Sequence, residues 1–65
     1  MFYFNDKPVE AQAGITLKEI IKLQGRDPAL VIAEVDGRFV PREEYRKLAL
    51  PEGARVKVWE LLDGG

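Results

Sequence analysis

The stretch Arg55-Val56-Lys57-Val58-Trp59-Glu60-Leu61-Leu62, residues 55–62, runs directly into Asp63-Gly64-Gly65, where the sequence ends. Its valines alternate with charged residues, which is typical of a β-strand with one buried face, so we expect both valines to face the core and Trp59 to point away from it. The alternation breaks at Leu61 and Leu62, immediately before the tail. The stretch therefore predicts a last strand that leads into a short glycine tail.

The Gly64-Gly65 end carries the one candidate reactive group of the chain. Glycine has no Cβ, so this end can adopt backbone angles closed to other residues and can enter a narrow slot, where it presents the Gly65 carboxylate. Chain ends are also commonly frayed, and linkers contain glycine, so the two glycines by themselves leave the function open.

The size and composition are those of one small folded domain. Its 65 residues are 46% hydrophobic and 32% charged, and ten basic residues against eleven acidic ones give a net charge of −1. This balance, without a long block of like charge, argues against nucleic acid as a partner. Cysteine and histidine are both absent, which excludes disulfides, thiolate nucleophiles and the usual zinc sites. We therefore expect no bound metal and no enzyme active site.

The sequence contains no recognisable targeting signal. No apolar run approaches the roughly 18 residues that a membrane span needs, and no signal peptide opens the sequence. We therefore expect a cytoplasmic protein with no membrane partner.

The sequence opens with a predicted hairpin. In its first strand Phe2 and Phe4 are expected to face the core, while Tyr3 lies on the outer face. A turn at residues 6–8 then leads to a second strand at residues 9–12.

A short amphipathic helix follows the hairpin. Thr16 and Glu19 have the spacing of a capping box, in which each side chain satisfies a backbone N–H of the other residue. Gly25 provides a left-handed stop, so we expect a helix of two to three turns. Its apolar side consists of Leu17, Ile20 and Ile21.

The middle of the chain predicts a second hairpin. Residues 29–35 are nearly all apolar and favour a central strand, Asp36-Gly37 is a strong hairpin turn signal, and residues 38–40 form a brief return strand. The polar segment 42–47 then suggests a turn or short helix with Tyr45 directed inward.

This order predicts an α+β fold in which a mixed sheet of four to five strands packs on one short helix. With the last strand beside the first and parallel to it, the last strand lies in the middle of the sheet, which is the ubiquitin-like β-grasp arrangement. We expect the domain to span residues 1–62 and residues 63–65 to form a flexible tail.

Taken together, these features resemble the ubiquitin-like sulfur carriers (ThiS/MoaD-like), and most closely the carriers of thiamine biosynthesis. The matching segments are Phe2-Tyr3-Phe4-Asn5, Val40-Pro41-Arg42-Glu43-x-Tyr45, Glu52-Gly53, the valine strand and Gly64-Gly65. The resemblance covers essentially the whole chain, and the diglycine is its most specific part. Thiamine carriers often have glycine or another small residue where this chain has Asp63, so the pathway stays open.

The resemblance implies a carrier protein and not an enzyme. It implies that the Gly65 carboxylate is adenylated by a ubiquitin-activating-like adenylyltransferase (ThiF/MoeB-like) and converted to a thiocarboxylate. The thiocarboxylate then donates sulfur to a synthase such as thiazole synthase (ThiG-like). ATP and Mg belong to the activating enzyme, and the chain itself binds no cofactor.

A partner also has to hold the folded domain. Large apolar side chains on the outer face of the sheet are candidates for this contact, because exposed apolar patches mark interfaces, although isolated surface aromatics are common. The expected partner-binding residues are Tyr3, Phe39, Trp59, Leu61 and Leu62.

Several functions fit the same features. A molybdopterin or tungstopterin sulfur carrier has the same fold and tail, and a ubiquitin-like carrier for tRNA thiolation or protein conjugation shares the first chemical step. A noncovalent β-grasp interaction module, in which the diglycine is incidental, belongs to a different class. A small enzyme fits worst, because acids such as Asp36, Glu43 and Glu60 form no catalytic pattern in the sequence.

Overall fold

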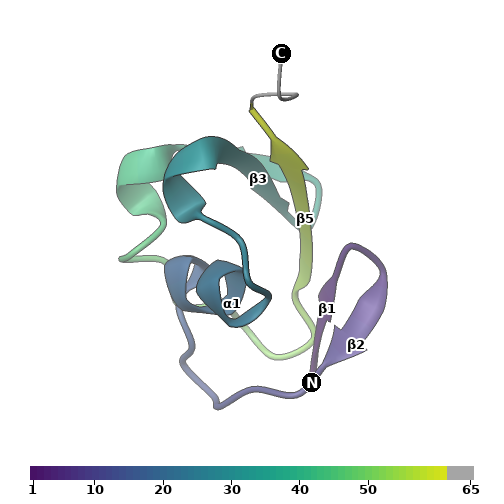
Figure 1. Ribbon diagram of the computed structural model, residues 1–65. Coiled ribbons are helices and arrows are strands. Elements are labelled where there is room, and N and C mark those ends of the chain that lie inside the picture. Colours follow the sequence, from purple (N-terminus) through teal and green to yellow (C-terminus); the bar gives the residue numbers. More distant parts are fainter. Residues whose placement is uncertain (62–65) are drawn as a thin grey trace.

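Short alternating strands assemble into a five-stranded mixed sheet in the computed structural model, which describes residues 1–61 (Figure 1). In chain order the elements are β1 (Phe2–Phe4), β2 (Lys7–Val9), α1 (Leu17–Leu23), the 3₁₀ turn η1 (Pro28–Leu30), β3 (Val31–Val35), β4 (Arg38–Val40), the 3₁₀ turn η2 (Arg42–Glu44) and β5 (Arg55–Glu60). The strand order is β2-β1-β5-β3-β4, with β5 parallel to β1 and antiparallel to β3. The predicted α+β class and β-grasp arrangement are confirmed, and the last strand lies in the middle of the sheet.

The core lies between α1 and the side of the sheet that faces it. The alternation in β1 and β5 buries Phe2, Phe4, Val56 and Val58, as the sequence predicts. The buried side chains of α1 are Leu17, Ile20 and Ile21. Tyr45, after η2, is only 3% exposed and donates its hydroxyl to the Val31 carbonyl at 3.2 Å. A buried tyrosine thus gains a partner for its polar end, which fixes the segment after β4 against the start of β3.

The capping box of α1 is formed. Thr16 Oγ1 accepts from the Glu19 N–H at 3.2 Å, and Glu19 Oε1 accepts from the Thr16 N–H at 2.9 Å. The helix ends at Leu23, Gln24 is its C-cap, and Gly25 follows at a φ of 78°. The predicted start and stop of the helix are therefore both confirmed.

The first hairpin is tighter than its sequence predicts. Its turn consists of Asn5 and Asp6, with φ of 49° and 71°, and β2 occupies Lys7–Val9, so the predictions of a turn at 6–8 and a strand at 9–12 are wrong. Two consecutive left-handed residues make the two-residue turn that matches strand twist. Pro8 fits in β2 because this strand lies at the sheet edge, where a missing N–H is tolerated.

Two other strands are shorter than expected. The Asp27 side chain accepts from the Ala29 N–H at 2.9 Å and caps η1, so β3 starts at Val31 and not at residue 29. β3 is an interior strand beside β5, which itself occupies the centre. β5 ends at Glu60, whereas the sequence predicted a strand through residue 62. The Asp36-Gly37 turn, with φ of 52° and 83°, and β4 agree with the prediction.

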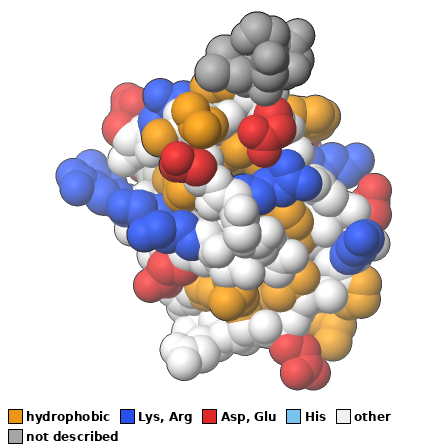
Figure 2. Space-filling view, in the orientation of Figure 1, with side chains coloured by type: hydrophobic (Ala, Val, Ile, Leu, Met, Phe, Trp, Pro, Cys, Tyr) orange, Lys and Arg blue, Asp and Glu red, His pale blue; other side chains and the backbone are white. Residues whose placement is uncertain are grey.

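The surface carries both signs of charge, and Lys and Arg side chains gather on the left of Figure 2, where Figure 1 draws the segment that follows β4. None of the helices within residues 1–61 is long and apolar enough to cross a bilayer.

Candidate functional site

The base of the tail is the C-terminal end of β5, and neighbouring strands hold it from two sides. On one side β3 pairs with β5 along its whole length, from Val35 opposite Val56 to Val31 opposite Glu60. The Leu61 N–H donates to the Leu30 carbonyl at 2.8 Å, which extends the bonding one residue beyond the strand. The backbone is therefore anchored as far as the last residue that the structure describes. Leu62, Asp63, Gly64 and Gly65 lie outside the described residues, as do the predicted tail and its boundary.

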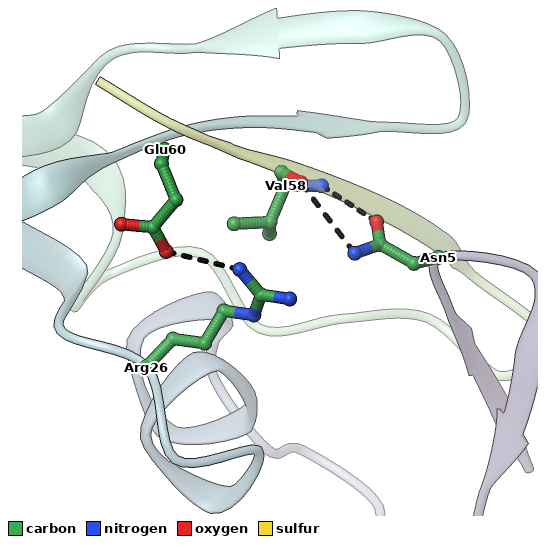
Figure 3. A network of polar contacts seen from close by, with 4 residues as sticks. All are labelled: Asn5, Arg26, Val58 and Glu60. Atoms are coloured by element: carbon green, nitrogen blue, oxygen red, sulfur yellow. Dashed lines mark hydrogen bonds and ion pairs between the residues drawn. The ribbon is translucent and has the colours of Figure 1, made fainter. Parts of the chain in front are cut away.

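On the other side of β5, the Asn5 side chain continues the hydrogen bonding beyond the end of β1. In the parallel β1–β5 ladder the Asn5 N–H donates to the Val56 carbonyl at 2.8 Å, and the next bond would join the Val58 N–H to the Asn5 carbonyl. The backbone turns away from β5 at Asn5. The Asn5 side-chain Oδ1, in place of the Asn5 carbonyl, accepts from the Val58 N–H at 2.9 Å (Figure 3). Asn5 Nδ2 also makes a longer contact of 3.5 Å with the Val58 carbonyl. One side chain thus prolongs the ladder toward the tail.

An ion pair lies beside this anchor. Arg26, from the loop after α1, donates to Glu60 Oε2 at 2.9 Å (Figure 3). The two side chains are 37% and 49% exposed, so the pair contributes at most about 1 kcal/mol to stability. Its position matters more, because it connects the last residue of β5 to the helical layer. Neither the Asn5 nor the Arg26 contact is predictable from the sequence, since each joins residues distant in the chain.

The outer face of the sheet, opposite α1, carries the predicted apolar side chains. Trp59 is 47% exposed and pairs with Ile32 of β3, while Leu61, just after β5, is 44% exposed. Phe39, at 64%, is the most exposed large apolar residue within residues 1–61 and pairs with Glu34. By register these apolar side chains lie on one face, between the level of Lys57 and that of Leu61, and we call them the outer patch. Its residues are Ile32, Phe39, Trp59 and Leu61.

Tyr3 lies on the same face but at the other end of β5. It pairs with Arg55, four residues before Trp59, which corresponds to about 13 Å along the strand. The Arg55 guanidinium covers its ring at 5.0 Å from the centroid. Lys57 separates the two aromatic positions along β5. The structure therefore does not bring Tyr3 together with the other predicted contact residues.

The described part of the chain offers little catalytic chemistry of its own. Within residues 1–61, no three His, Cys, Asp or Glu side chains gather into a group that could hold a metal ion. The candidate acids are spread out: Asp36 lies in the β3–β4 turn, Glu43 in η2 and Glu60 at the end of β5. The arrangement instead provides a rigid central strand that leads toward the last four residues of the sequence.

A β-grasp sheet whose central strand is bonded on both sides and precedes a diglycine is the architecture of ubiquitin-like proteins. The sequence profile of the ThiS family matches residues 2–65, and the chain belongs to this family. Members of the family are sulfur carriers and not enzymes, and they work with adenylyltransferases and sulfur-accepting enzymes. The expectation of a carrier, drawn from the resemblance, is thereby confirmed.

Two relatives illustrate the similarity. The sulfur carrier protein ThiS of Escherichia coli (strain K12) is 24% identical over 62 residues, which cover 95% of this chain and 94% of that protein. The crystal structure of the thiamine biosynthesis protein (ThiS) from Geobacter metallireducens superposes with a TM-score of 0.77 at 21% identity, covering 98% of this chain and 97% of that chain. The structural similarity supports the fold.

Proposed function

We propose that this protein carries sulfur as a thiocarboxylate on Gly65 and delivers it for thiazole formation in thiamine biosynthesis. The observation that carries the proposal is the anchoring of β5 through Leu61, with β3 on one side and the Asn5 side chain on the other. A reactive terminus has to be placed accurately in a partner's active site, and a base that does not move lowers the entropic cost of placing it. Membership of the ThiS family supports the pathway.

The chemistry proceeds in two transfers. The Gly65 carboxylate attacks the α-phosphorus of ATP, and pyrophosphate leaves, which gives an acyl adenylate. Hydrosulfide supplied by the partner then attacks the Gly65 carbonyl carbon, AMP departs with the electrons of the broken C–O bond, and loss of the sulfur-bound proton leaves the thiocarboxylate. A carboxylate is a poor electrophile, so adenylation is needed to supply a leaving group. ATP and Mg²⁺ are bound by the activating enzyme.

Glycine at both terminal positions serves access to that active site. A Cβ at position 64 or 65 would restrict the backbone and add bulk where a channel closes around the tail. The absence of cysteine fits this scheme, because the sulfur is held on the main chain and no thiol of the carrier competes for the adenylate.

The outer patch is the proposed contact for the adenylyltransferase, which is ThiF/MoeB-like, and for the acceptor, which is ThiG-like. Trp59 and Leu61 flank the base of the tail, so a partner that covers them also receives residues 62–65. Aromatic anchors of this kind contribute most of the affinity in many interfaces. Leu62 belongs to the proposed contact by its place in the sequence.

Intact mass spectrometry of protein purified gently from its native cells tests the proposal. Replacement of one oxygen by sulfur adds about 16 Da, and C-terminal fragmentation has to locate the change at Gly65 because methionine oxidation adds nearly the same mass. A variant without Gly64 and Gly65 is the matched control and should never gain the mass. A plain carboxylate that persists after incubation with ATP, a sulfur source and the host's activating enzymes would exclude sulfur carriage.

The pathway needs a separate readout. The thiocarboxylate form, once prepared, is offered to a thiazole synthase and to a pterin synthase subunit in parallel reactions. Sulfur transfer to the thiazole synthase alone supports thiamine biosynthesis, whereas transfer to the pterin synthase alone assigns the chain to the other pathway.

A further inference from the structure

A second surface feature lies on the helical side of the domain, away from the outer patch. It is a shallow pocket of about 240 Å³, bounded by the start of α1, by η1 and by the segment at η2. Its uncharged lining residues are Pro28, Ala29 and Tyr45, which we call the floor, and the charged lining residues are called the rim. We call it the basic pocket, because of the side chains at its rim.

The rim carries three cations and one acid. Lys18 comes from α1, while Arg42 and Arg46 come from the segment after β4, and Glu43 is the acid. The ion pairs within residues 1–61 are Met1–Glu52 and Arg26–Glu60, so the three rim cations have no acidic partner in this part of the chain. This concentration of positive charge stands out on a chain whose net charge is −1.

Stability does not explain this arrangement. Lys18 lies in the first turn of α1, where the helix dipole disfavours a cation. Arg42, Arg46 and Lys18 are like charges that line one pocket, and neither ion pair within residues 1–61 involves them. Side chains gathered against these costs indicate a role in binding an anion.

The pocket is held in shape by backbone contacts. The Lys18 N–H donates to the Tyr45 carbonyl at 2.9 Å, and the Tyr45 N–H donates to the Arg42 carbonyl at 3.0 Å. The buried Tyr45 hydroxyl bonds to the carbonyl of Val31. The two segments that supply the rim cations are therefore fixed relative to each other, and a ligand meets a site that is already formed.

We infer that the basic pocket binds an acidic peptide segment of a partner protein, with one apolar side chain on the floor and carboxylates on either side paired with the rim cations. The volume lies below the roughly 300 Å³ at which pockets for small molecules begin, which favours a single side chain over a whole metabolite. The combination of an apolar floor and a cationic rim is complementary to alternating acidic and apolar residues.

The basic pocket is connected through η1 to the base of the tail. η1 forms one wall of the pocket, and its last residue, Leu30, bonds to Leu61 at the base of the tail. A partner segment in the basic pocket therefore contacts η1, which is bonded to the base of the tail through Leu30 and Leu61, and leaves the outer patch free. The inference does not depend on the chemistry proposed for Gly65, because the two concern different surfaces.

NMR of the full-length ¹⁵N-labelled protein provides the test, with the acetylated and amidated peptide Glu-Asp-Phe-Asp-Glu as the probe. Shifts are expected at the amides around Lys18, Ala29 and Tyr45, with weaker binding at high salt because the contact is electrostatic. Replacing the probe's Phe by Ser should weaken binding, and replacing its acids by Lys should abolish it. No shift at millimolar probe, or shifts spread over the outer patch, would overturn the inference.

Charge-reversed variants test the residues. Arg42→Glu combined with Arg46→Glu is expected to weaken binding of the probe at least about tenfold, since two attractive contacts become repulsive. Lys7→Glu combined with Arg38→Glu makes the same change in net charge on the two edge strands and should leave affinity within about twofold. If both double variants lose affinity equally, the net charge of the protein explains the loss, and the proposed site is refuted.

Two further measurements cover unfolding of the double variant and binding of a small anion in place of the peptide. If Arg42→Glu with Arg46→Glu loses the native spectrum, Lys18→Gln tests the same rim from α1, and unchanged affinity in that variant would contradict the proposal. Inorganic phosphate is titrated separately. If phosphate produces the same shifts at the same concentration as the peptide, the pocket takes a small anion and the peptide inference is wrong.

Discussion

The Asn5 contact with Val58 gives the most specific prediction about the base of the tail. Asn5→Gly removes the side-chain acceptor of the Val58 N–H while keeping a residue that adopts the φ of 49° without strain. The loss of one partly buried hydrogen bond should cost about 1 kcal/mol. Asn5→Ala removes the same bond and adds the left-handed cost of a Cβ, about 1 kcal/mol, for a total of about 2 kcal/mol.

Urea and thermal unfolding followed by circular dichroism measure these losses. In a domain of this size each kcal/mol lowers Tm by roughly 4–8 °C, so the two variants are distinguishable. Amide hydrogen exchange at Val58 reports the contact directly and should become faster in both variants. Asn5→Asp retains an acceptor oxygen and should lose less than Asn5→Gly.

Asp6→Gly is the matched control. Asp6 is the neighbouring turn residue at a φ of 71°, and its side chain forms no hydrogen bond within the described residues, so this variant should be at least as stable as the natural chain. If Asn5→Gly is as stable as Asp6→Gly, and Val58 exchanges at the natural rate, then the side chain does not extend the ladder and the reasoning about the tail base is wrong.

Other outcomes follow from the same structure. Trp59→Ala should weaken binding of the adenylyltransferase by about 2 kcal/mol in calorimetric titration, whereas Tyr3→Ala, at the far end of β5, should have little effect; similar losses would contradict the extent of the outer patch. Thr16→Ala should cost about 1 kcal/mol in urea unfolding through loss of the helix cap, and an unchanged midpoint would count against it. Arg26→Ala should change stability by no more than about 1 kcal/mol because its ion pair is exposed, and a larger loss would show that the pair is part of the framework.

Local signals in the sequence predicted most of the fold. The capping box at Thr16 and Glu19, the Asp36-Gly37 turn and the alternation around Val56 each involve residues a few positions apart, and each has the predicted geometry. The errors are also local. Asn5 and Asp6 adopt left-handed angles without a glycine, so the first turn gave no clear sequence signal.

The candidate site was predictable only in part. Trp59, Leu61 and Phe39 are exposed, and the alternation of the last strand indicated this for Trp59. The bond from Asn5 to Val58 joins residues 53 positions apart, and no periodic pattern predicts such a contact. The basic pocket likewise combines side chains from separate segments, whose charges read individually as solvent-exposed.

The parallel pairing of β1 with β5 has a mechanical consequence. The first residue of β1 and the last residue of β5 lie at opposite ends of the pair, as the ribbon in Figure 1 shows. Tension between Met1 and Leu61 would therefore load the interstrand hydrogen bonds in shear, so that they resist together, whereas a pull on edge strand β2 would open its bonds to β1 one after another. The domain is thus built to withstand pulling along β5, in the direction in which a partner would draw on the C-terminal end of the chain.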